Sequence, residues 1–260
     1  MNTVLKNKNL QKVTFIKHWT ENLFSFRINR PTSFKFRSGE FVMIGLPNQD
    51  GKPILRAYSI ASPSWSEELE FYSIIVQDGP LTSKLKDIKI NDDIILMPKP
   101  TGTLVLDALK PGKRLFLLSS GTGFAPFSSL IREPETFEKF EKVIVTHTCR
   151  TVKELKYSQD IIKEALNDEM ISDFISNKLI YYHSTTRENY LNKGRITDLI
   201  TSHKLFKDLN IAKISQDDRI MICGSMGLNN DLKDILANLN LNEGANNKPA
   251  EFVLEKAFVG

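Results

Sequence analysis

The hydrophobic pattern of this 260-residue chain changes character near residue 110, and this change constrains the fold more than any other feature. Before it, short apolar runs alternate with turn residues, and only one short helix is predicted, at 81–85. After Pro111-Gly112, strand-like runs alternate with helical stretches. Such alternation is typical of a mostly parallel sheet covered on both faces. The sequence therefore predicts two domains, residues 1–109 and residues 110–260.

The first domain is predicted to be an antiparallel β-barrel, closed or nearly closed, because its strands are short and closely spaced. Turn signals such as Arg30-Pro31, Asp50-Gly51 and Asp78-Gly79-Pro80 separate them. The strands are predicted at 13–19, 23–28, 40–46, 55–60, 69–76, 94–97 and 103–106. The second domain is predicted to be α/β, with strands at 114–119, 142–148, 178–184, 219–223 and 251–258 and helices at 124–132, 152–166, 196–201 and 228–239.

The composition is that of a soluble globular protein, with 41% apolar and 25% charged residues. The net charge of +4 is spread along the chain. It is too weak to indicate nucleic-acid binding, but it allows a basic face for an acidic protein partner. Residues 1–12 lack the apolar stretch of a signal peptide, and no apolar run is long enough to cross a bilayer. We therefore expect a cytoplasmic protein without a membrane span.

Cysteine and histidine usage indicates no metal centre. The only two cysteines, Cys149 and Cys223, cannot supply the roughly four ligands of an iron–sulfur cluster and give no disulfide framework. The four histidines show no metal-ligand spacing. The apolar residues of the helix at 152–166 recur at helical spacing and are predicted to pack.

Two segments carry residue types suited to nucleotide cofactors. The run 56–59, Arg-Ala-Tyr-Ser, offers a cation, a flat ring and a hydroxyl to a phosphate-bearing aromatic ligand. The run 121–123, Gly-Thr-Gly, is a strand-to-helix turn of the kind that seats a pyrophosphate. Pro126 stands where a dinucleotide fingerprint would have its third glycine, so the turn alone does not predict a Rossmann site. In isolation, Arg56 would more often form a surface ion pair, Tyr58 could equally be a core residue, and the glycine turn would more often be simple strand-to-helix geometry.

Five segments in order resemble the ferredoxin/flavodoxin–NADP+ reductase family. Segments 56–59 and 79–83 resemble its flavin-binding pair, and 121–123 and 223–225 its pyridine-nucleotide signatures. The ending at 255–260 resembles the bacterial branch, in which an alanine and a short tail replace a terminal aromatic residue. The resemblance covers about 200 residues and implies an enzyme with FAD in the barrel and NADP(H) on the α/β domain.

The resemblance implies particular contacts to FAD. Arg56 would neutralise a phosphate, the Tyr58 ring would lie against the isoalloxazine, and the backbone at 81–83 would bind the pyrophosphate. The alternative for 79–83 is a capped helix without a ligand. The residues implied to contact FAD are Arg56, Ala57, Tyr58, Ser59, Tyr72, Ser73, Ile74, Leu81, Thr82, Ser83, Thr122, Ala257 and Phe258.

The choice of NADP over NAD follows from charge. NAD sites commonly place a carboxylate on the ribose, and the strand ends at 148–150 and 184–187 carry none. They carry arginines instead, at places where the family uses arginines for the 2′-phosphate. Any one of these arginines alone would more often be a solvated surface residue, but all three at matching strand ends would not. The residues implied to contact NADP are Gly121, Gly123, Arg150, Thr186, Arg187, Arg195, Gly224 and Ser225.

Three residues are implied to act at the reacting atoms. Ser59 would point its hydroxyl near flavin N5, and the Cys223 sulfur would lie against nicotinamide C4. Glu255 would orient the nicotinamide or relay a proton. Without the resemblance, the same residues would be an ordinary strand serine, a small buried cysteine and a strand-end surface glutamate.

The predicted function is hydride transfer between NADP(H) and FAD and single-electron transfer between FAD and ferredoxin or flavodoxin. A generic NAD(P)H-flavin reductase or an oxygenase-reductase component is an alternative within the same fold. A non-catalytic flavin-binding module is an alternative of another class. A nucleic-acid-binding barrel is disfavoured, because aromatic and basic residues do not interleave on one strand face. We expect a monomer.

Overall fold

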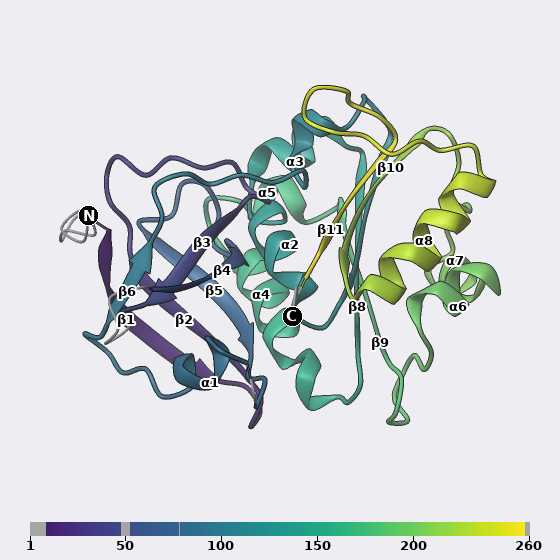
Figure 1. Cartoon of the computed structure of the whole chain (residues 1–260). Helices are drawn as coiled ribbons and strands as arrows, with labels where there is room; N and C mark the ends of the chain where they lie inside the picture. Colours follow the sequence, from purple (N-terminus) through teal and green to yellow (C-terminus); the bar gives the residue numbers. More distant parts are fainter. Residues whose placement is uncertain (1–8, 48–52, 78, 258–260) are drawn as a thin grey trace.

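The change of architecture near residue 110 is confirmed by the computed structural model, which describes residues 9–47, 53–77 and 79–257. A six-stranded antiparallel sheet lies on the left of Figure 1 and a five-stranded parallel sheet on the right. The predicted turn at Asp50-Gly51 and residue Asp78 lie outside the described residues.

The first sheet has the strand order β4-β3-β6-β1-β2-β5, and every neighbouring pair is antiparallel. A single short helix, α1 (Thr82–Leu85), follows the fifth strand. Phe24, Phe26 and Phe71 are fully buried on the inner face of the sheet. The strands of this sheet are β1 (Leu10–His18), β2 (Leu23–Asn29), β3 (Phe41–Leu46), β4 (Ile54–Ser59), β5 (Glu68–Ile74) and β6 (Asp93–Leu96).

The two edge strands of this sheet, β4 and β5, curl towards each other. The hydroxyls of Tyr58 and Ser73 share a hydrogen bond of 3.0 Å, and Tyr58 packs edge-on against Phe71 at 6.2 Å between ring centroids. Just beyond β4, Ala61 N–H donates to the Glu70 carbonyl at 2.8 Å. The sheet is therefore a barrel closed by side chains and one backbone bond, as the spacing of the strands predicted.

The strand predicted at 103–106 is wrong. This segment ends in a 3₁₀ turn, η1 (Leu106–Ala108), and Thr103 pairs with no strand of the barrel. The Thr103 N–H instead donates to the Glu255 carboxylate, and the Thr103 hydroxyl lies 3.3 Å from the Leu254 carbonyl, its acceptor. The polar groups of Thr103 are satisfied by the last strand of the chain, about 150 residues away, which no local pattern reveals.

The second sheet has the order β11-β10-β7-β8-β9, and all four pairings are parallel. Its central strands β7 and β10 are largely buried and carry the apolar runs 115–118 and 220–223, as is typical of a sheet covered on both faces. Its strands are β7 (Arg114–Ser120), β8 (Lys142–Cys149), β9 (Leu179–Thr185), β10 (Asp218–Gly224) and β11 (Phe252–Lys256).

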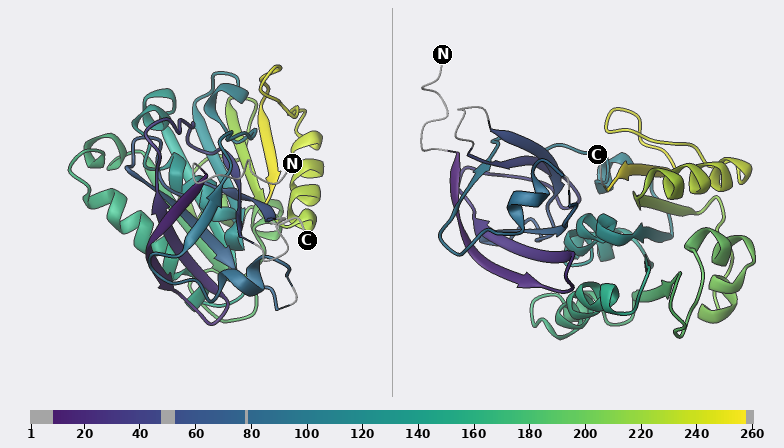
Figure 2. Two further views of the ribbon diagram at one scale, coloured as in Figure 1. Left: turned by 60° about the vertical axis from the view of Figure 1, so that its left-hand side comes forward. Right: turned by 60° about the horizontal axis from the view of Figure 1, so that its bottom comes forward.

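Helices cover both faces of this sheet. Helices α2 and α4 lie on the face towards the barrel, and α6, α7 and α8 lie on the other (Figures 1 and 2). Helices α3, α5 and α7, of six, four and six residues, were not predicted. The helical elements are η2 (Gly121–Gly123), α2 (Phe124–Leu130), α3 (Pro134–Lys139), η3 (Lys153–Leu155), α4 (Lys156–Asn167), α5 (Ser172–Ile175), α6 (Ile196–Thr201), α7 (Lys204–Leu209) and α8 (Met226–Asn238).

The two sheets share one apolar cluster. Tyr157 of α4 is fully buried and stacks on Tyr72 of β5, with ring centroids 4.1 Å apart. Trp19 and Phe124 meet the Tyr157 ring edge-on at 5.3 and 6.1 Å. The Tyr157 hydroxyl donates to the Glu70 carboxylate at 3.0 Å. The Tyr157 side chain of the second domain thus packs against residues of the first domain.

Polar contacts clamp the same boundary around the end of α2. The Glu133 carboxylate accepts from the Ser38 and Ser64 hydroxyls, each at 2.7 Å. The Ser129 hydroxyl donates to the Ser62 carbonyl at 2.7 Å. Arg132 donates to the Ala61 carbonyl at 2.6 Å.

Among the helices of the described residues, none has the length and apolar character needed to cross a membrane.

Candidate functional site

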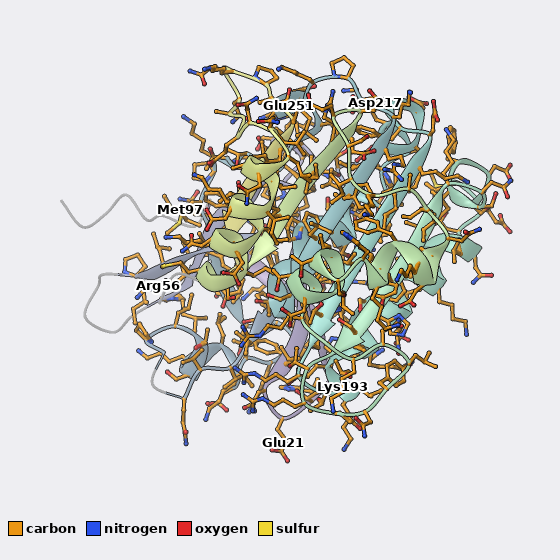
Figure 3. All side chains as sticks on the ribbon, turned by 90° about the vertical axis from the view of Figure 1, so that its right-hand side faces the viewer. Glu21, Arg56, Met97, Lys193, Asp217 and Glu251 are labelled. Atoms are coloured by element: carbon orange, nitrogen blue, oxygen red, sulfur yellow. The ribbon has the colours of Figure 1, made fainter. Side chains whose placement is uncertain are left out.

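A cavity of about 570 Å³ opens at the carboxyl ends of the parallel strands, where the two sheets meet. In Figure 3, Asp217 and Glu251 mark the opposite end, where β10 and β11 begin, and Lys193 and Glu21 lie at the carboxyl-end side. Open α/β sheets bind ligands at this edge. Eight residues predicted for the site line the cavity, namely Ile74, Gly121, Thr122, Arg150, Thr186, Arg195, Ser225 and Ala257.

The glycine turn η2 joins β7 to α2 at the floor of this cavity. Gly121 has a φ of +54°, a conformation that favours glycine. A Cβ on Gly123 would lie 2.0 Å from the Cys223 carbonyl oxygen, so the turn needs glycine there to reach the end of β10. A Cβ on Gly224 would lie 2.6 Å from the Ser120 hydroxyl. Gly123 and Gly224 thus allow two strand ends to touch, and neither lines the cavity itself.

The amino end of α8 faces the cavity. Ser225 caps this helix, and its hydroxyl accepts from Leu228 N–H at 3.3 Å. Ser225 and Gly227 both line the cavity. A helix of 13 residues presents the positive end of its dipole and unpaired N–H groups at this point. The site is therefore suited to an anion.

The arginine-bearing loops after β8 and β9 form the far end of the cavity. Arg150, Thr186 and Arg195 line it, whereas Arg187 does not, although all three arginines are exposed. None of the three guanidinium groups forms an ion pair with a carboxylate of the described residues. The structure thus brings two of the three predicted arginines together with Thr186 and leaves their charges available.

Two glutamates hold these loops in place, and the sequence analysis missed both. The Glu154 carboxylate accepts from Arg150 N–H at 2.7 Å, and the Glu188 carboxylate accepts from Val152 N–H at 2.7 Å. Arg187 N–H donates to the Arg150 carbonyl at 3.0 Å, so the two loops are bonded to each other. Glu154 lies five residues after the end of β8, a position from which a carboxylate caps free N–H groups.

On the barrel side, Arg56 and Ala57 are exposed at the outer margin, and Figure 3 labels Arg56 there. The Arg56 guanidinium donates to the Leu55 carbonyl at 2.9 Å and has no carboxylate partner among the described residues. Tyr58 and Ser59 are half-buried, and burial raises the pKa of the Tyr58 hydroxyl. The cation, ring and hydroxyl are thus on one strand, with the cation outermost.

Two predicted flavin contacts of β5 are engaged within the protein. One face of the Tyr72 ring stacks on Tyr157, and the buried Tyr72 hydroxyl has no partner among the described residues. The Ser73 hydroxyl bonds to Tyr58. Ile74, the next residue, lines the cavity. The end of β5 therefore reaches the site through Ile74.

The predicted phosphate turn does begin a helix. Leu81 is buried and precedes α1, and the Thr82 hydroxyl bonds the Val76 backbone N–H and carbonyl, both at 3.2 Å. Ser83 N–H donates to the Gly79 carbonyl at 3.1 Å. Of the three backbone N–H groups predicted for a pyrophosphate, that of Ser83 is therefore already bonded.

Cys223 and Glu255 are opposite each other on β10 and β11. Burial raises the pKa of the Cys223 thiol, which is fully enclosed. Burial also raises the pKa of Glu255 to about 7, although Thr103 N–H donates to its carboxylate. Ser59 lies on the other sheet, opposite Phe41. The structure thus pairs two of the three predicted catalytic residues and gives one of them a proton that titrates near neutral pH.

Within the described residues, no three metal-ligating side chains gather. Phe258, predicted to contact FAD, lies outside the described residues.

Two family models match the chain. The oxidoreductase FAD-binding domain matches residues 8–106, and the oxidoreductase NAD-binding domain matches residues 117–234. The fold and the site thus define the class, a two-domain oxidoreductase that joins a flavin domain to a nicotinamide-nucleotide domain.

Individual relatives narrow the class. A flavodoxin/ferredoxin–NADP reductase of Rhodobacter capsulatus is 58% identical over 251 residues, which cover 96% of this chain and 93% of that protein. A ferredoxin–NADP reductase of Azotobacter vinelandii is 47% identical, with coverage of 98% and 99%. The crystal structure of a ferredoxin NADP+ reductase from Neisseria gonorrhoeae with bound FAD and NADP superimposes with a TM-score of 0.86 at 27% identity, covering 96% and 98%. The chain therefore belongs to the bacterial ferredoxin/flavodoxin–NADP+ reductase family, as its five motifs predicted.

Proposed function

We propose that this protein transfers hydride between NADP(H) and FAD and passes single electrons between FAD and ferredoxin or flavodoxin. The observation that carries the proposal is the cavity of about 570 Å³, in which the arginine loops, the glycine turn and Ala257 meet Ile74 of the barrel. When bound, the flavin supplies the exchange between two-electron and one-electron chemistry. The 47–58% identity to reductases of this type supports the assignment.

The residues present fit NADP(H). Arg150 and Arg195 bind the 2′-phosphate, with the Thr186 hydroxyl as a further donor, because their charges have no carboxylate partner among the described residues. The amino end of α8 binds the pyrophosphate. The glycine turn and Ala257 bound the nicotinamide end. Arg187, exposed beside Arg150, adds a longer-range positive charge.

The residues present also fit FAD. Arg56 offers a phosphate a guanidinium that has no carboxylate partner among the described residues, and Tyr58 offers a half-buried ring to the isoalloxazine. Leu81 and Thr82 contribute backbone N–H groups, and the Tyr72 hydroxyl, which has no partner among the described residues, is a further donor. Further contacts to FAD in this proposal are made by Ala57, Ser59, Ser73, Ser83, Thr122 and Phe258.

Glu255 holds a proton near neutral pH at its carboxylate, opposite Cys223 on the next strand. We propose that Glu255 supplies or stores a proton beside the nicotinamide, and that the buried Cys223 sulfur shapes its pocket. Ser59 is the third proposed catalytic residue and comes from the barrel.

The proposed division into two domains, between residues 109 and 110, falls between η1 and β7.

The partners follow from charge and family. The net charge of +4 favours small acidic carriers such as ferredoxin and flavodoxin. We propose a cytoplasmic monomer with no nucleic-acid partner.

Anaerobic stopped-flow tests the function directly. NADPH should bleach the flavin absorption of the holoprotein, and ferredoxin or flavodoxin should restore it, while NADH acts far more slowly. A protein that stays colourless after incubation with FAD would contradict the proposal. If free flavins were reduced faster than either carrier, a generic flavin reductase would be favoured.

A further inference from the structure

A fully buried histidine supports the glycine turn from inside the protein. His147 lies on β8, and its Nε2 is 2.8 Å from the Gly121 carbonyl oxygen. Its Nδ1 is 2.6 Å from the hydroxyl of Ser158 on α4. The same hydroxyl is 2.6 Å from the hydroxyl of Tyr181 on β9. Three secondary-structure elements thus meet in one chain of hydrogen bonds that ends at the turn.

The direction of each hydrogen bond follows from the groups involved. The Gly121 carbonyl only accepts, so Nε2 of His147 must carry the proton. Burial lowers the pKa of His147 to about 4, so the ring is neutral and Nδ1 accepts from Ser158. The Leu155 carbonyl also lies 2.9 Å from this hydroxyl, but a proton placed there would leave buried Nδ1 without a donor. The Tyr181 hydroxyl then donates to Ser158.

The opposite side of the glycine turn faces the cavity. Gly121 and Thr122 line the cavity, and nothing lies within 4 Å of a Cβ placed on Gly121. A trans peptide points its C=O and N–H in opposite directions. Because the Gly121 carbonyl points inward to His147 and also accepts from Phe124 N–H, the Thr122 N–H points away from His147, towards the cavity.

We propose that His147 is a positioning residue for the nicotinamide end of the nucleotide. By holding the Gly121 carbonyl inward, it fixes the peptide that presents Thr122 N–H to the ligand, with Ser158 and Tyr181 fixing its tautomer. This inference rests on the proposed function, because the nicotinamide is assigned to this end of the cavity there. A plain packing role is the rival, since the His147 ring also lies 4.9 Å from the Phe124 ring.

A pair of substitutions separates the two roles. His147→Leu keeps apolar bulk but removes the N–H donor, and His147→Gln keeps a donor. We expect His147→Leu to slow flavin reduction by NADPH about 5- to 10-fold, the loss of one hydrogen bond. His147→Gln should recover most of the rate. Binding of 2′,5′-ADP, which occupies only the arginine end, should change less than about 2-fold, since that end stays intact.

The matched control is His183, which is in register with His147 on β9 and whose ring nitrogens have no partner among the described residues. His183→Leu should leave flavin reduction unchanged. Hydrogen exchange measured by mass spectrometry adds a readout that needs no activity. Peptides covering 121–124 should exchange faster in His147→Leu and not in His183→Leu.

Should His147→Leu fail to fold, Ser158→Ala replaces it, because it frees the ring to adopt the wrong tautomer with little loss of volume. It should speed exchange at the turn and slow reduction less than His147→Leu would. The inference is overturned if His147→Gln is no better than His147→Leu, if 2′,5′-ADP binding falls in parallel, or if exchange at the turn is unchanged. A wild-type protein that NADPH does not reduce would instead refute the proposed function, while the exchange measurement still tests the contact.

Discussion

The two sheets bring their site residues together in different ways. In the parallel sheet, Ser119, His147, Cys223 and Glu255 lie side by side in register, because every strand ends at the same edge. In the barrel, Tyr58 and Ser73 lie on strands at opposite ends of the strand order and meet only because the sheet curls. Strand direction therefore builds the nucleotide half of the site, and sheet closure builds the flavin half.

The largest effect is expected where two strand ends touch in the parallel sheet. Gly123→Ala places a methyl group 2.0 Å from the Cys223 carbonyl oxygen, and its nearest neighbours are all backbone atoms, which cannot yield as the end of a flexible side chain would. We expect the free energy of unfolding to fall by about 3 kcal/mol or more. Urea denaturation monitored by circular dichroism measures this. Gly227→Ala, with nothing within 4 Å of the new methyl, is the control and should change stability by less than about 0.5 kcal/mol.

The next prediction compares two arginines of the nucleotide half, Arg195 and Arg187. Arg195→Ala should raise the Michaelis constant for NADPH about 10- to 100-fold, the loss of a charged hydrogen bond. The constant for NADH should hardly change, because NADH lacks the 2′-phosphate. Arg187→Ala should have the smaller effect, since Arg187 does not line the cavity. Equal losses with both nucleotides would rule out a phosphate contact.

A pH effect is expected where the last strand meets the barrel. Burial raises the pKa of Glu255 to about 7 from an ordinary value of 4.5. Between these values the unfolded chain releases a proton that the folded protein keeps, so the contribution of Glu255 to stability is greatest below pH 4.5 and falls as the pH rises towards 7. We expect this residue to remove roughly 2–3 kcal/mol over that window. Glu255→Gln should abolish this part of the slope in urea midpoints measured at pH 5 and 7.5, and an unchanged slope would refute it.

The smallest effect concerns barrel closure. Tyr58→Phe removes the hydroxyl that joins β4 to β5, so the free energy of unfolding should fall by about 0.5–1.5 kcal/mol. Tyr190→Phe is the matched control, because within the described residues the Tyr190 hydroxyl makes a single contact, with Gln159 at 3.5 Å. If both variants unfold at the same urea concentration, closure does not depend on this bond.

The sequence could predict what depends on neighbouring residues. Apolar runs and turn residues place the parallel strands, and their common direction brings Gly121, Thr186 and Arg195 to one cavity. The long-range contacts that hold the loops and helices around that cavity in place could not be predicted. Glu188 meets Val152 from 36 residues away, and Tyr157 meets Glu70 from 87 residues away. Thr103 shows the same limit, because a strand-like run is held by the distant Glu255 rather than by a neighbouring strand.

The aromatic contact of Tyr157 with Tyr72 has a consequence for how the protein melts. Leu23 and Tyr72 of the barrel belong to the same apolar cluster as Phe124 and Tyr157 of the parallel sheet. Separating the two domains would expose apolar surface on each, so neither domain should stay folded once the other has unfolded. Heat should therefore disrupt both together, and a calorimeter should record one cooperative peak instead of two.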